Sequence, residues 1–171
     1  VVAVDYRRAP EYPFPAAQDD ALAAAAAIAE RSGDFGDSNG SLVLAGDSAG
    51  GHLALATTLA AETALAGRVR GIIATYPVVD HYTEDYDSYV ERARGQALTA
   101  SLMRWFWDTY LAGADPTAAG TQRAFPIRSA DLAALPPVLL CTAGRDPLRD
   151  EGIAMLEKLR GQDVAVEYEH Y

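Results

Sequence analysis

The stretch Ser41-Leu42-Val43-Leu44-Ala45-Gly46-Asp47-Ser48-Ala49-Gly50-Gly51 decides how this chain folds. Its apolar first half predicts a buried strand over residues 41–45, and a helical pattern follows from about Ala49 to Ala66. Between them lies a G-x-S-x-G pattern, which is typical of a sharp strand-to-helix turn that lifts a serine hydroxyl clear of a sheet. A plain turn, or one that binds a phosphate, is the alternative interpretation.

Outward from this stretch, short β-branched runs alternate with longer helical patterns. This alternation predicts an α/β fold with a mainly parallel sheet and helices on both faces, in one domain over residues 1–171. Strands are expected at residues 1–5, 41–45, 71–76, 137–142 and 164–168, and helices at residues 18–31, 49–66, 99–111 and from 146–147 to about 160.

The composition excludes several kinds of partner. The chain of 171 residues carries 14 Lys and Arg against 24 Asp and Glu, a net charge of −10 that repels phosphate backbones, so no nucleic-acid partner is expected. The longest apolar run, residues 21–29, is too short for a membrane span. Cys141 is the single cysteine and the three histidines are scattered, so no disulfide, metal or organic cofactor is expected.

A candidate acid follows the fourth predicted strand, 98 residues after Ser48. Asp146 stands where a parallel strand ends, and it could orient and support a histidine base. It could equally cap a helix that begins at Pro147, and the two roles are compatible. We expect Asp150 and Glu151 to be helix-dipole partners or solvated charges. The Ala49 N–H, at a helix start, could stabilise an oxyanion.

Four spaced blocks carry a family resemblance. They are DYRRAPEYPFPAA at residues 5–17, GDSAGGHLA at 46–54, YPVVD at 76–80, and the stretch 135–152 from LPP to DPLRDEG. Together they resemble the bacterial hormone-sensitive-lipase-like esterases, the α/β-hydrolase fold-3 group. Arg8 and Tyr12 stand where the family commonly has Leu and His, a departure expected to affect packing. The resemblance implies an α/β-hydrolase fold and a serine carboxylic ester hydrolase, with Ser48 as nucleophile, Asp146 as triad acid and the Ala49 N–H as one oxyanion donor. The implied substrates are small-molecule esters with short to medium acyl groups.

Two family features are not in view. The His-Gly-Gly-Gly oxyanion loop is expected upstream of Val1, and the catalytic histidine a few residues past Tyr171. The apolar runs at both ends likewise predict that the chain is an internal fragment, a partial catalytic domain. None of the visible histidines is expected to be the base: we predict that His52 is structural, that His81 is a solvated loop residue and that His170 lies in or beside the last strand.

The sequence leaves open where four aromatic side chains lie and which of several functions the chain has. Trp105, Phe106, Trp107 and Tyr110 could line an acyl pocket or belong to the core, and two of the four are expected to pack inward. Cys141 is interpreted as a small hydrophobe. The rival functions are a ligand-binding receptor that has lost the histidine, as in the plant gibberellin receptors that resemble this family, and a peptidase or amidase. A cytoplasmic location is the expectation, and homo-oligomerisation is left open.

Overall fold

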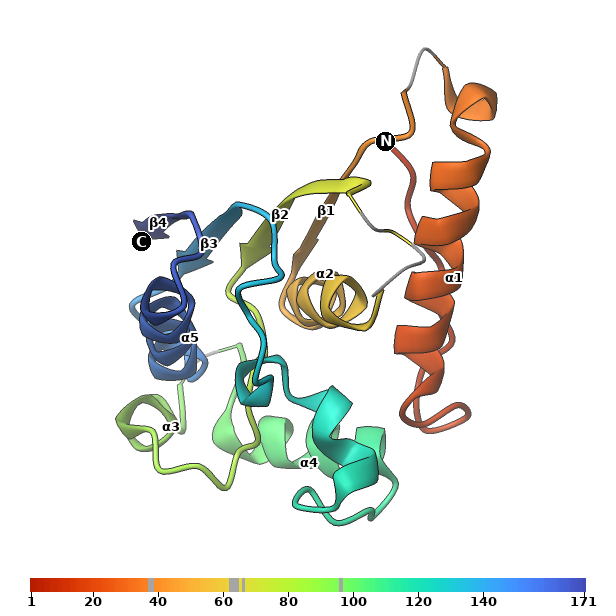
Figure 1. Cartoon of the computed structure of the whole chain (residues 1–171). Coiled ribbons are helices and arrows are strands. Elements are labelled where there is room, and N and C mark those ends of the chain that lie inside the picture. The colour runs from red at the N-terminus through yellow and green to blue at the C-terminus, as the bar shows by residue number, and fades with distance from the viewer. Residues whose placement is uncertain (37–38, 62–64, 66, 96) are drawn as a thin grey trace.

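A parallel sheet of four strands forms the centre of the computed structural model, which describes residues 1–36, 39–61, 65, 67–95 and 97–171. The strands are β1 (Leu42–Asp47), β2 (Val69–Thr75), β3 (Val138–Thr142) and β4 (Val166–His170), in the order β1-β2-β3-β4. Because all three pairs are parallel, the carboxyl ends of the strands lie at one edge of the sheet (Figure 1). The predicted parallel α/β architecture is confirmed.

Helices provide the connections between these strands. α2 (Ala49–Ala60) follows β1, and α5 (Arg149–Gly161) joins β3 to β4. The long connection from β2 to β3 holds α3 (Asp87–Glu91) and α4 (Ala100–Leu111), below the sheet in Figure 1, with 3-10 turns at Ala119–Ala124 and Pro126–Arg128. α1 (Ala16–Glu30), followed by a 3-10 turn at Ser32–Phe35, precedes the first strand. Among the described helices, none has both the length and the apolar character needed to cross a membrane.

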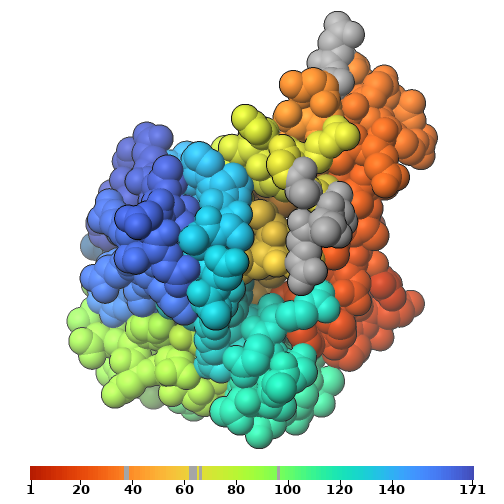
Figure 2. All heavy atoms as spheres, in the orientation of Figure 1, coloured from red at the N-terminus to blue at the C-terminus, as the bar shows by residue number. Residues whose placement is uncertain are grey.

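The main core lies where α2 and α5 pack on one face of the sheet. Strand side chains alternate between the two faces, so every second residue of β2 and β3 points into this core. Its fully buried members include Leu55, Ile72, Leu140, Met155 and Leu159. On the other face, Val43 is 59% and Ile73 37% exposed, so the described helices that pack on the sheet cover one of its faces, whereas helices were expected on both. In the space-filling view α1 forms one flank of the molecule, and α5 with β4 the opposite flank (Figure 2).

A second buried cluster lies beyond the sheet edge that carries the strands' carboxyl ends. It joins α3 and α4 to the loop before α5 and includes Tyr89, Met103, Trp107, Phe125 and Leu148. A third cluster holds α1 against the end of α2 through Ala25, Ala29, Ala61 and Leu65. The second cluster holds α4 and the loop before α5 beside the carboxyl ends of the strands.

Several element boundaries differ from the sequence expectations. The predicted strand at residues 1–5 was wrong: this segment is exposed and pairs with none of the described strands, and an apolar run without a partner forms no ladder. α2 ends at Ala60, and residues 62–64 and 66 of its predicted extension lie outside the described residues. α5 begins at Arg149 because residues 146–148 form a turn, and β4 begins at Val166 because Asp163, with φ 58°, closes another.

Candidate active site

Ser48 occupies a strained turn between β1 and α2. Its φ of 51° lies in the region that favours glycine. Backbone hydrogen bonds fix the turn on both sides: the Ser48 N–H donates to the Thr75 carbonyl at 2.9 Å, and the Ser48 carbonyl accepts from the His52 N–H at 3.0 Å. The sequence prediction of a sharp strand-to-helix turn with the serine at its apex is therefore confirmed.

The flanking glycines allow this turn because two backbone segments approach closely. A Cβ on Gly46 would lie 2.3 Å from the carbonyl carbon of Gly50, which no real side chain tolerates. A Cβ on Gly51 would lie 3.0 Å from the Pro77 Cβ. A Cβ on Gly50, in contrast, would have no atom within 4 Å apart from the helix's own nearby backbone. The motif thus contains a glycine that packing demands and one that it does not.

Ser48 lies on the wall of a cavity of about 330 Å³. Helix α4 supplies much of the lining, with contributions from residues 6–9 and from the start of α2. All four aromatic residues singled out in the sequence line it: Trp107 is buried and Tyr110 half-buried, whereas Trp105 and Phe106 are about half exposed. The prediction that two of the four pack inward is confirmed. The lining is mostly apolar, so it suits a hydrocarbon or aromatic group next to Ser48.

Asp146 follows β3 at the same sheet edge. The strand ends are tied together there, because the Ser48 N–H binds the end of β2 and the Tyr76 N–H donates to the Cys141 carbonyl of β3 at 2.7 Å. The Asp146 carboxylate accepts a hydrogen bond from the Leu148 N–H at 2.9 Å, so it stabilises the turn before α5. Burial raises the pKa of Asp146 above its usual range, and the Leu148 hydrogen bond opposes that rise.

His52 is buried, and both of its ring nitrogens have hydrogen-bond partners. Its Nδ1 lies 3.0 Å from the Val78 carbonyl, which can only accept, so Nδ1 carries the proton. Its Nε2 is then the acceptor for the Gln18 side-chain amide at 3.2 Å. Burial lowers the pKa of His52 to about 4, so the ring stays neutral at physiological pH. The prediction of a structural role is confirmed.

The other two histidines also have partners of their own. His81 was expected in solvent, and this was wrong: its Nδ1 lies 2.8 Å from the Thr83 hydroxyl and its ring packs on Tyr82 and Trp107. The second buried cluster explains the error, since α4 folds back over the loop after β2. His170 lies in β4, as predicted, with Nδ1 2.8 Å from the Thr142 hydroxyl. Within the described residues, no histidine hydrogen-bonds to the side chain of Ser48 or Asp146.

Glu151 was expected to be a helix-dipole partner or a solvated charge; it does lie in the first turn of α5, but the expectation of a solvated charge was wrong. Its side chain is completely buried, and its carboxylate accepts hydrogen bonds from the Val79 N–H and the Tyr89 hydroxyl, both at 2.7 Å. Burial raises the pKa of Glu151 to about 8, against the effect of these donors. A sequence signal for this burial exists, because Glu151 lies four residues before Met155 and eight before Leu159, on the buried stripe of α5.

Asp150 and Cys141 belong to the two elements that flank Asp146, which are α5 and β3. Asp150 is half-buried, and its hydrogen bond from Arg149 at 2.6 Å lowers its pKa, so it belongs to an ion pair. Cys141 is half-buried in β3, and burial raises the pKa of its thiol. A thiol with a raised pKa is a poor nucleophile at neutral pH, in agreement with its interpretation as a small hydrophobe.

The chain is similar to a known protein family and to several curated proteins. A family model described as alpha/beta hydrolase fold matches residues 1–171. Carboxylesterase NlhH of Mycobacterium tuberculosis is 36% identical over 98% of the chain and 52% of its own length. Carboxylic ester hydrolase LipN of the same organism is 38% identical over 98% of the chain and 45% of its own length. The chain thus spans about half the length of the curated relatives it matches.

The fold of the chain is also similar to that of solved esterase structures. A thermostable esterase from Pseudomonas putida ECU1011 superposes with a TM-score of 0.89 and 37% identity, over 98% of this chain and 52% of that one. With the family model matched along the whole sequence, the chain belongs to the alpha/beta hydrolase fold family, in its hormone-sensitive-lipase-like esterase group.

Proposed function

We propose that the full-length protein is a serine carboxylic ester hydrolase that acts on small-molecule esters with short to medium acyl groups. One observation carries the proposal: Ser48 stands at a backbone turn strained to φ 51°, at the start of a helix and on the wall of an apolar cavity. A purely structural βα turn would not need a non-glycine residue in that conformation. The named esterases among the relatives support the same reaction class.

In the proposed reaction the Ser48 hydroxyl attacks the ester carbonyl and transfers its proton to a histidine base. The resulting oxyanion accepts a hydrogen bond from the Ala49 N–H in the first turn of α2, where the backbone has no intrahelical acceptor. Collapse of this intermediate expels the alcohol, which takes the proton from the imidazolium. Water then attacks the acyl-enzyme with the same histidine as base and releases the acid.

Asp146 has the proposed role of orienting that histidine and stabilising its charged form. The base itself is proposed to lie beyond the 171 residues, because both ring nitrogens of His52 are engaged and Nδ1 of His81 and of His170 lies near a hydroxyl. The raised pKa of Asp146 follows from burial, and an imidazolium beside it would lower this pKa again.

The test is turnover of p-nitrophenyl esters of increasing acyl length by the full-length protein and its Ser48→Ala variant. Loss of the nucleophile is expected to lower kcat by about 10⁴-fold or more without unfolding the chain. Ser101→Ala is a matched control, since Ser101 is exposed on α4 and its hydroxyl contacts Thr99.

Three outcomes separate the rival functions. Covalent labelling of Ser48 by a fluorophosphonate, with ester turnover lost in Ser48→Ala, supports the hydrolase. Ligand binding without turnover in the natural protein would identify a receptor. Faster cleavage of matched anilides than of esters would identify an amidase. Near-normal ester turnover by Ser48→Ala would refute the assignment of the nucleophile.

A further inference from the structure

The loop that carries Asp146 is held in place by the short helix α3, which belongs to the connection between β2 and β3. The Asp146 carboxylate accepts from the Leu148 N–H, so its orientation depends on where the backbone of residues 147–148 lies. That backbone runs between β3 and α5. Leu148 is itself buried in the cluster formed with α3 and α4. The position of Asp146 is therefore tied to elements that come from the β2–β3 connection.

Ser88 of α3 makes the most direct of these contacts. Its hydroxyl donates to the Pro147 carbonyl at 2.6 Å and accepts from the Asp150 N–H at 3.3 Å. Its own backbone N–H donates to the Asp150 carboxylate at 2.8 Å. Ser88 is completely buried, so water cannot replace these bonds. One residue thus clamps the backbone on both sides of the turn that Asp146 begins.

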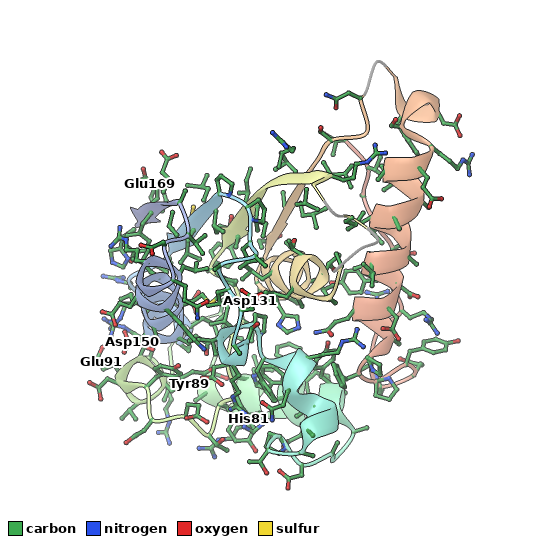
Figure 3. The ribbon with its side chains drawn as sticks, in the orientation of Figure 1. His81, Tyr89, Glu91, Asp131, Asp150 and Glu169 are labelled. Atoms are coloured by element: carbon green, nitrogen blue, oxygen red, sulfur yellow. The ribbon has the colours of Figure 1, made fainter. Side chains whose placement is uncertain are left out.

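Two other residues of α3 also contact the start of α5. Tyr89 donates from its hydroxyl to Glu151 at 2.7 Å, and Glu91 pairs with Arg149 at 3.0 Å. Figure 3 shows Tyr89 and Glu91 beside Asp150, where α3 meets the start of α5. α3 has five residues, too few to be stable as an isolated helix, so docking on this loop is what holds it in place.

We propose that Ser88 is a positioning residue for the reaction: by clamping the Pro147 carbonyl it holds the Asp146 carboxylate where the histidine base needs it. This inference rests on the proposed ester hydrolysis. A triad acid supports its histidine through a directional hydrogen bond, and a displacement of about 1 Å in such a site can lower the rate by about 100-fold. Because Ser88 is not among the residues that line the cavity beside Ser48, its loss should leave substrate binding unchanged.

The experiment compares Ser88→Ala with wild type in the full-length protein, with kcat expressed per active site titrated by a fluorophosphonate. We expect kcat to fall about 10- to 100-fold while KM changes by less than about two-fold. Unfolded molecules do not react with the fluorophosphonate, so they lower the number of titrated sites. They therefore leave the kcat per titrated site unchanged. Ser88→Cys, with a weaker donor of similar size, replaces the alanine variant if that variant does not fold. Ser101→Ala is the control.

A double-mutant cycle with Asp146→Asn identifies the route of the effect. If Ser88 acts through Asp146, Ser88→Ala should lower kcat by less than about two-fold in the Asp146→Asn background. An unchanged kcat per site in Ser88→Ala, or an equal loss in both backgrounds, would overturn the positioning role while leaving ester hydrolysis intact. Turnover that survives Ser48→Ala would overturn the proposed function, and this inference with it.

Discussion

The side-chain amide nitrogen of Gln18 lies 3.2 Å from Nε2 of His52, on the opposite side of the ring from the Val78 carbonyl. The contact joins α1 to α2, and the same amide donates to the Arg123 carbonyl at 2.9 Å. His52 has a partner at each nitrogen only as the neutral Nδ1–H tautomer. A second proton would turn Nε2 into a donor facing the Gln18 amide, so acidification breaks this link.

The first prediction is that His52 makes the protein less stable in acid. Its pKa is about 4 in the folded state and near 6.5 in the unfolded state, so the unfolded chain binds more protons between these values. Stability therefore falls as the pH drops from 6.5 to 4, by up to roughly 3 kcal/mol from this group. Urea unfolding of wild type and His52→Gln across that range measures it. Equal slopes in both proteins would contradict the assignment.

Glu151 is predicted to act in the opposite direction. Burial raises its pKa from 4.5 to about 8, so the folded state binds this proton more tightly. Its contribution to stability is complete below pH 4.5 and is lost as the pH rises through 8, by up to roughly 5 kcal/mol. Glu151→Gln mimics the protonated form and can still pair with Val79 and Tyr89. Its free energy of unfolding, relative to wild type, should therefore rise from pH 5 to pH 9. A constant difference would show that the carboxylate stays ionised.

Asp146→Asn is predicted to lower kcat strongly, by about 10⁴-fold if the asparagine holds the histidine in the wrong tautomer. Asn keeps an oxygen for the Leu148 N–H, so the turn and the free energy of unfolding should change little. Asp131→Asn is the control, because Asp131 is exposed, and Asp150→Asn tests the neighbouring carboxylate, which lies four residues away and pairs with Arg149. A silent Asp146→Asn with a severe Asp150→Asn would mean that the acid has been assigned to the wrong carboxylate.

The two glycines of the motif should respond differently to alanine. Gly46→Ala forces a Cβ into the backbone of Gly50 at 2.3 Å, so we expect a loss of stability of several kcal/mol or failure to fold. Gly50→Ala meets open space inside α2 and should be neutral or stabilising by about 0.5–1 kcal/mol. Thermal and urea unfolding of both variants test the pair. A well-folded Gly46→Ala would refute the close approach of β1 and α2.

The 171 residues expressed alone are predicted to have negligible esterase activity. Within the part of the chain that the structure describes, no histidine reaches Ser48 or Asp146 through a hydrogen bond. The exposed residues Val1, Val2 and Val4, together with the open edge of β1, should also promote self-association. Ester turnover and monomer content by size exclusion measure both. A monomer whose turnover is lost in Ser48→Ala would instead assign the base to His52, His81 or His170.

Local features of the sequence predicted the core of the fold. The Ser48 turn could be predicted because strand, small residues and helix follow one another within about ten positions, so the geometry depends on neighbours in the chain. The parallel sheet followed from the alternation of strands and helices. The strand at residues 1–5 failed because pairing depends on a partner, which the run itself does not specify.

Features set by distant contacts could not be predicted in the same way. His81 is buried by Trp107 and Phe125, more than 20 residues away, and nothing in its own neighbours signals this. α3 was missed because five residues show no helical periodicity. The role of Ser88 was hidden for the same reason, since its partners Pro147 and Asp150 lie about 60 residues further along the chain.

The positive φ of Ser48 has an evolutionary consequence. A non-glycine residue in such a conformation destabilises the folded chain by roughly 1–3 kcal/mol, whether or not substrate is present. Glycine at this position would relieve that strain and remove the hydroxyl in a single step. Selection for folding and selection for chemistry therefore oppose each other at residue 48, and a lineage released from the need for turnover would be expected to drift toward glycine there before it lost the surrounding fold.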